Sequence, residues 1–153
     1  MPNDNNRPTR QDQWAIIVHY QGNSIGYFDK KSGGAVDSDD TKYYPGDMAD
    51  PISLGGRRTT DNVTLQRIYD GDLDHTRVFA GGKTLIQALM DGAGKSAVTV
   101  TQRPKDRDGN GYGQRITWNG ILKRVLPPET DSESSSAAML EIEIAPIGTP
   151  TMT

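Results

Sequence analysis

Short stretches in which apolar and polar residues alternate recur along this chain, and they restrict its fold more than any other feature. In the clearest stretch, Leu140, Ile142 and Ile144 alternate with Glu141 and Glu143. A period of 2 places apolar side chains on one face of a β-strand and polar ones on the other. This strand therefore belongs to a sheet with one wet face. We predict strands over residues 14–20, 59–69, 97–102, 115–125 and 138–145, with residues 26–29 as a hairpin partner of the first.

One segment has the pattern of a helix. Leu85 and Leu89 fall on one stripe, and Thr84 with Gln87 has the form of a capping box. A start as early as Asp74 would enclose two consecutive glycines, at a cost of about 1 kcal/mol each relative to alanine. The second half of this region is therefore the better helix.

These elements predict a mainly β fold: a β-sandwich or barrel with one flanking α-helix and a long inter-strand loop. A chain of 153 residues fits one domain. We expect a flexible N-terminal arm over residues 1–13, the β domain over 14–146 and a flexible C-terminal tail over 147–153. Gly120 breaks the phase of its strand, which predicts a β-bulge there. The expected core residues are Trp14, Ile16, Val18, Val63, Leu65, Leu85, Leu89, Val98, Val100, Ile116, Trp118, Leu140, Ile142 and Ile144.

A long polar segment, residues 27–56, precedes the second strand. Loops in compact domains have a median of about 4–6 residues, so a loop of about 30 is either disordered or functional. Its glycine, proline and aspartate clusters make regular structure unexpected there. We interpret it as an arm that reaches a neighbouring subunit or ring. The candidate contact residues are Asp29, Lys30, Lys31, Asp37, Asp39, Asp40, Tyr43, Tyr44, Asp47, Arg57 and Arg58.

Composition excludes several classes of protein. There are no cysteines, so disulfides, thiolate metal sites and cysteine nucleophiles are excluded. The net charge of −3 argues against a protein built to grip nucleic acid, because phosphate binding depends on a basic surface. No apolar run is long enough to cross a bilayer, and residues 1–7 lack the apolar region of a signal peptide. We expect no association with membranes.

Two motifs have the appearance of ligand sites. Residues 106–111 match the first half of a calcium loop, but the twelfth position is Thr117 where a bidentate glutamate is needed. The same residues are a strong turn signal, so a hairpin tip is favoured over calcium binding. Gly94-Lys95-Ser96 resembles the end of a phosphate-binding loop. It follows a helix instead of opening one, which argues against nucleotide binding.

Catalytic groups are sparse. The two histidines, His19 and His75, lie apart from any nucleophile, and we expect structural roles for both. We therefore predict no catalytic residues, no metal ligands and no cofactor. Residues 129–136 form an acidic, serine-rich loop, either solvated or a subunit contact, with the solvated reading favoured.

The chain resembles the tail tube protein of long-tailed bacteriophages of the siphophage type. Four stretches, taken in their order along the chain, carry the resemblance: residues 55–65 leading into 67–70; residues 74–75 before the helix; residues 98–104 with 106–111; and residues 119–132 with 138–144. Together they span most of the chain. The Gly81-Gly82 pair departs from the unbroken helix of the family.

The resemblance implies a structural virion protein. Six copies of such a protein form a ring, and rings stack into a hollow tube through which the genome passes without specific binding. The implied partners are other copies of the chain, proteins at the tube ends and a tape-measure protein in the lumen. The implied location is the phage tail, assembled in the host cytoplasm. A tube protein of a contractile secretion system and a monomeric β-sandwich binding module remain alternatives.

Overall fold

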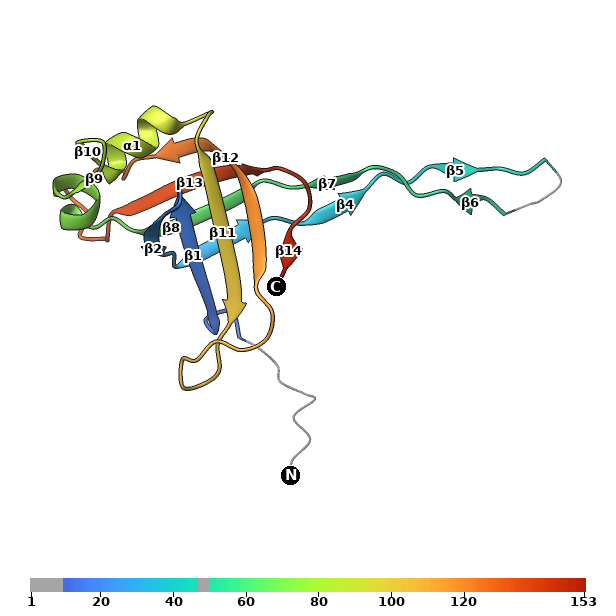
Figure 1. Cartoon of the computed structure of the whole chain (residues 1–153), viewed down its shortest axis with the longest axis horizontal. Helices are drawn as coiled ribbons and strands as arrows, with labels where there is room; N and C mark the ends of the chain where they lie inside the picture. Colours follow the sequence, from blue (N-terminus) through green and yellow to red (C-terminus); the bar gives the residue numbers. More distant parts are fainter. Residues whose placement is uncertain (1–9, 47–49) are drawn as a thin grey trace, which may run out of the picture.

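The computed structural model describes residues 10–46 and 50–153, and it is built around one large antiparallel sheet (Figure 1). The sheet has eight strands in the order β2-β1-β11-β12-β13-β8-β3, with β14 paired to β12. Their bounds are Trp14–Tyr20 (β1), Asn23–Tyr27 (β2), Lys30–Gly33 (β3), Val63–Ile68 (β8), Ala97–Pro104 (β11), Ile116–Leu126 (β12), Met139–Pro146 (β13) and Thr151–Met152 (β14). The mainly β prediction is confirmed.

The sheet curls until its two end strands meet. β2 pairs with β1 at one end of the order and β3 with β8 at the other, yet β2 and β3 are consecutive in the chain. The link between β2 and β3 is hydrogen-bonded to both β1 and β8. The Phe28 N–H donates to the Ile16 carbonyl, and the Asp29 N–H donates to the Gln66 carbonyl, each at 2.9 Å. The sheet therefore surrounds a single core, as a barrel does.

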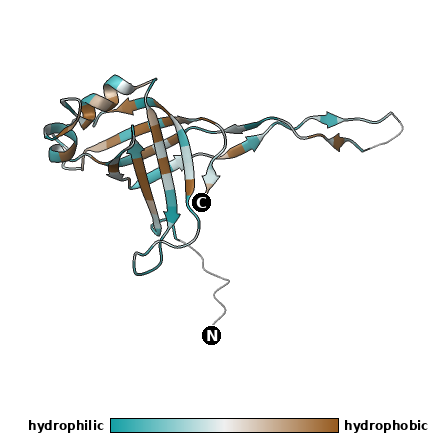
Figure 2. Cartoon of the chain, in the orientation of Figure 1, coloured by the Kyte–Doolittle hydropathy of each residue, from teal (hydrophilic) through white to brown (hydrophobic). Residues whose placement is uncertain are grey.

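The inward-facing side chains of the strands form that core. Buried residues are Ile16, Val18, Tyr20, Ile25, Phe28, Val63, Leu65, Leu85, Leu89, Val98, Val100, Trp118, Leu122, Leu140, Ile142 and Ile144. Of the expected core residues, Trp14 and Ile116 are only half-buried. Trp14 borders a surface hollow at the start of β1, whereas Ile116 still packs against the edge of the core. Figure 2 shows these apolar residues running along the strands of the body.

A single α-helix, α1 (Leu85–Gly92), covers one end of the core through Leu85 and Leu89. The Thr84 side chain accepts a hydrogen bond from the Gln87 amide, as the capping box predicts. The chain before the helix differs from a helical extension. A π-helical turn, η1 (Gly71–Thr76), leads into the short hairpin β9 (Val78–Ala80) and β10 (Lys83–Thr84).

Two glycines explain why the helix does not start earlier. Gly81 and Gly82 have φ of +61° and +76° and form the two-residue turn between β9 and β10. Consecutive positive φ values are the requirement of the commonest tight hairpin turn. The glycine pair therefore closes a hairpin and cannot lie inside α1.

The predicted bulge lies elsewhere in β12. Gly120 stays in register with Val98 and Pro146, whereas the register shifts between Leu122 and Arg124. A β-carbon at Gly120 would lie 2.4 Å from the Ala145 carbonyl oxygen. The glycine therefore permits close approach of β13, and the prediction of a bulge at this residue was wrong.

The C-terminal end of the chain is held on the sheet by backbone hydrogen bonds. Residues 1–9 of the expected N-terminal arm lie outside the described residues. At the other end, β14 pairs with Ile116 and Thr117, and Arg115 and Thr153 exchange two backbone hydrogen bonds of 2.9 and 3.0 Å. These bonds fix the end of the expected C-terminal tail on the sheet.

Candidate assembly surface

The long polar segment is a β-hairpin that projects from the body (Figure 1). Its outgoing side continues from β3 into β4 (Val36–Ser38) and β5 (Lys42–Tyr43), and it returns through β6 (Ile52–Ser53) and β7 (Arg58–Thr60). β4 pairs with β7 and β5 with β6. We call residues 34–61 the arm. The expectation of an irregular loop was wrong, because turn-forming residues here alternate with short ladders that satisfy the backbone.

Cross-strand hydrogen bonds run along the arm. The Asp61 amide donates to the Ala35 carbonyl at 2.9 Å, the Asp39 amide to the Arg57 carbonyl at 3.1 Å, and the Leu54 amide to the Thr41 carbonyl at 2.7 Å. These bonds fix the register of the two sides. Among the described residues, the main contacts of β4, β5, β6 and β7 are with one another, and an isolated two-stranded hairpin is at best marginally stable in water.

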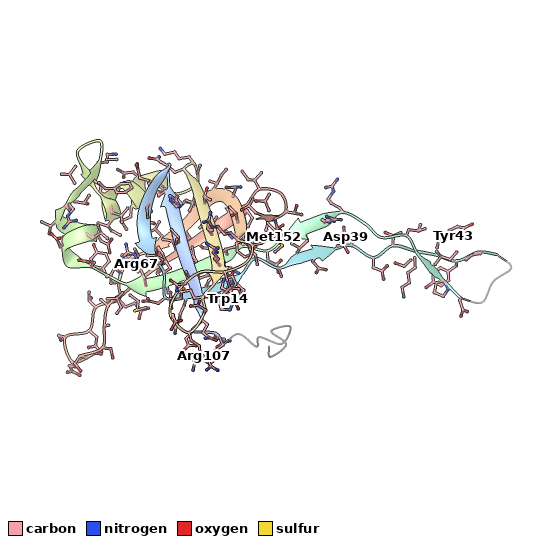
Figure 3. The ribbon with its side chains drawn as sticks, turned by 60° about the horizontal axis from the view of Figure 1, so that its bottom comes forward. Trp14, Asp39, Tyr43, Arg67, Arg107 and Met152 are labelled. Carbon is pink, nitrogen blue, oxygen red and sulfur yellow. The ribbon has the colours of Figure 1, made fainter. Side chains whose placement is uncertain are left out.

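Large apolar side chains of the arm face solvent. Tyr43 is 56% exposed, Tyr44 69% and Leu54 62%, and Val36 and Ile52 are also exposed. In Figure 3, the labelled Asp39 lies on the part of the projection nearer the body, and the labelled Tyr43 lies further out. Contiguous exposed apolar side chains typically mark an interaction surface. The arm therefore has the chemistry of a contact element without a partner inside its own chain.

The root of the arm is fastened to the body at Trp118. Its indole N–H donates to the Gly34 carbonyl at 3.1 Å, and the Lys31 ammonium lies 4.0 Å from the centre of the indole ring. Burial lowers the pKa of Lys31. Gly34 has φ of +82°, and a β-carbon there would lie 2.9 Å from the indole nitrogen. The direction in which the arm leaves the body is therefore set by packing.

The predicted contact residues fall into two groups. Asp29, Lys30 and Lys31 lie on the body, where they border the surface hollow that includes Trp14. The described residues of the second group lie on the arm and are all exposed: Asp37, Asp39, Asp40, Tyr43, Tyr44, Arg57 and Arg58. Asp47 lies outside the described residues. The structure thus separates a root cluster from the arm proper.

A buried ion pair lies at the opposite end of the body and was missed from the sequence. The Arg67 guanidinium donates to both carboxylate oxygens of Asp74, at 2.6 and 2.5 Å, and the Asp74 side chain is fully buried. The Asp70 amide adds a bond of 3.0 Å to the same carboxylate, and Arg67 stacks over the Phe28 ring. The sequence signal for this pair is Arg67 itself, which alternates with Val63 and Leu65 on the inward face of β8. A buried arginine needs an acidic partner, so this position predicts one nearby.

The other motifs have structural partners. The Asp106 carboxylate accepts bonds from the amides of Asp108 and Asn110, which closes the β11–β12 loop as a turn. His75 Nδ1 lies 2.9 Å from the Tyr69 hydroxyl, and burial, with the Asp74 charge, raises the pKa of Tyr69. Within residues 10–46 and 50–153, no group of three or more metal-ligating side chains converges. In the same part of the chain, no helix has the length and apolarity to cross a membrane.

Comparisons with known proteins identify similar folds but no matching sequence family. No protein-family model matches the chain, and neither does any curated protein sequence. Its fold is shared with chains of contractile injection particles. One comes from the PVC sheath–tube complex of an extracellular contractile injection system in the extended state, with a TM-score of 0.69, 19% identity and coverage of 95% of this chain and 91% of that one.

Two further structures extend this comparison. A chain of the PVC sheath/tube terminator gives a TM-score of 0.71 at 19% identity, covering 97% of this chain and 99% of the other. A chain of the tube-terminating cap of the anti-feeding prophage gives 0.69 at 17% identity, with 97% and 92% covered. At these identities the likeness establishes a common fold over nearly the whole chain.

Proposed function

We propose that this chain is a structural subunit of the hollow tube of a phage-tail-like contractile injection particle. Copies close into a ring, and rings stack. The observation that carries the proposal is the arm, a long hairpin with exposed apolar side chains and no contact with its own body beyond the root. The shared fold supports it, because the similar chains come from sheath–tube, terminator and cap assemblies of such particles.

The physical requirements of a tube match the features of the chain. A closed ring needs a heterologous interface that returns on itself, and a stack needs a second one that repeats without closing. The arm supplies reach, and Val36, Tyr43, Tyr44, Ile52 and Leu54 supply apolar area to bury on a neighbour. The proposed contacts are therefore the arm residues and the root cluster of Asp29, Lys30 and Lys31. No catalytic step is part of this function.

The proposed partners are other copies of the chain and, around the tube, a sheath. The tail tube of a long-tailed phage is the second candidate, favoured by the four sequence stretches that resemble that family. There the tube would enclose a tape-measure protein and pass DNA, for which a net charge of −3 is suitable. Particles isolated from producing cells separate the two candidates: a sheathed tube supports the first, and a bare tube supports the second.

Sedimentation velocity of the purified chain over a wide concentration range tests self-assembly. We expect a discrete ring of several copies, replaced by much larger species as the concentration rises. A single species with the mass of one 16.7 kDa chain at every concentration would contradict the proposal and favour a monomeric binding module. Calcium added to the same samples should leave the profile and the melting temperature unchanged.

A further inference from the structure

The outward face of β1, β11 and β12 carries a shallow groove with a basic lining. Ala15, Ile17 and His19 of β1 form one side of the groove, and the cations are Arg103, Lys105 and Arg115. No acidic side chain lines it. The chain as a whole has 20 acidic and 17 basic residues, so a surface with only basic charges differs from its average charge.

The cations of this groove have no ion-pair partner among the described residues. Among the same residues, Arg103 Nε is buried with no hydrogen-bond acceptor. The nearby turn contains Asp106 and Asp108, but the Asp106 carboxylate already accepts two backbone amides. Three cations on one surface without a counterion among the described residues favour an anionic group arriving from outside.

An acidic surface lies in the loop between β12 and β13. Glu129, Asp131 and Glu133 are exposed, and residues 127–138 contain no basic side chain. Asp131 closes a local turn by accepting the Glu133 amide at 3.0 Å. The described structure shows no ion pair for any of the three. The chain thus carries two unpaired charged surfaces of opposite sign.

These two surfaces lie at opposite ends of one strand. Arg115 immediately precedes β12, and Glu129 follows its end, so the 11 residues of β12 separate them. At about 3.3 Å per residue, the backbone of β12 is about 36 Å long, well over the screening length of about 8–10 Å at moderate salt. Complementary surfaces on opposite ends of identical subunits define a head-to-tail contact.

We propose that the basic groove of one copy receives the acidic loop, residues 129–133, of a second copy. This inference rests on the proposed function, since it names one of the contacts through which the tube would grow. The contact gives the assembly a fixed polarity, because acidic ends repel acidic ends and basic ends repel basic ones.

Charge reversal at the two ends tests this contact. Arg115→Glu and Glu129→Lys alter exposed side chains without hydrogen bonds in the described structure, so both variants should fold. At low salt, each should raise the protein concentration needed for assembly at least about tenfold, because the reversed side chain repels the facing surface and reduces the net charge of its own surface. The double variant Arg115→Glu/Glu129→Lys should return it to within about threefold of the unmodified chain, because opposite charges again face each other across the contact.

A matched control and three outcomes complete the test. Lys95→Glu makes the same change of charge at an exposed turn outside both surfaces, and it should leave assembly unchanged. An equimolar mixture of the two single variants should assemble, since the unchanged groove of Glu129→Lys can receive the unchanged acidic loop of Arg115→Glu. Normal assembly of the single variants, or a double variant no better than they are, would overturn this contact alone. Failure of the unmodified chain to assemble would overturn the proposed function as well.

Discussion

Arg67 and Asp74 show how one charged pair can organise the end of a β domain. Both side chains are removed from water, and together they join β8 to η1. A buried ion pair is weak support for stability relative to apolar residues, but removal of one partner leaves a buried charge. We therefore expect the folding of the segment before α1 to depend on both residues.

We expect Asp74→Asn to lower the free energy of unfolding by about 3–5 kcal/mol, because the Arg67 charge would remain buried without its counterion. Urea unfolding at neutral pH measures the loss. The exposed pair Arg77–Asp72 offers the control, since both side chains are more than half exposed and Asp72→Asn should cost about 1 kcal/mol or less. Equal losses in the two variants would contradict the assignment of a buried, structural pair.

Asp70 gives the domain a dependence on acid. Backbone amides of Leu73 and Asp72 hold the pKa of its carboxyl below the usual value of 3.8. The unfolded chain therefore binds more protons in the window below that value, and this contribution to stability is lost as pH falls through the lowered pKa. Asp70→Asn should lose less stability than the unmodified chain between about pH 6 and about pH 3. Parallel losses in urea titrations at both pH values would contradict this.

The arm shows where sequence reasoning worked and where it failed. The alternation of Leu140, Ile142 and Ile144 located β13, and the capping box located α1, because both signals are local. The arm was expected as a contact element but as an irregular one. Its strands are only 2 or 3 residues long, too short to show a period, so cross-strand hydrogen bonds specify them instead. The basic groove was not predicted, because β1 is distant in sequence from β11 and the start of β12.

Shortening the arm should separate assembly from folding. Replacing residues 40–56 with Asn-Gly joins Asp39 to Arg57, which already share a backbone hydrogen bond, through a tight hairpin turn. The removed segment packs only on itself, so the melting temperature of the body should change by no more than about 2–4 °C. Sedimentation should show no large species. Tubes formed as readily as by the full chain would contradict the role of the arm.

A variant of unchanged length distinguishes reach from contact chemistry. Tyr43→Ser with Leu54→Ser keeps the hairpin but removes two exposed apolar side chains. Each buried apolar side chain contributes about 1.5–3 kcal/mol, so assembly should require at least about tenfold more protein. An unchanged assembly threshold would mean that these side chains stay in solvent.

At the scale of the whole molecule, three features combine: a curled sheet around one core, a rigidly rooted arm, and charged surfaces of opposite sign at the two ends of β12. A monomeric binding module has no need for a long projecting hairpin that contacts nothing. A subunit that must touch neighbours within and between rings does. The tube is the function in which all three features are used.

Electron microscopy of the purified chain at high concentration and low salt tests this account most directly. We expect rings with a central hole and, at higher concentration, stacks of those rings forming hollow tubes of constant diameter. The shortened-arm variant on the same grids should show neither stacks nor tubes. Particles no larger than a single chain at every concentration, or filaments without a central channel, would contradict the central claim.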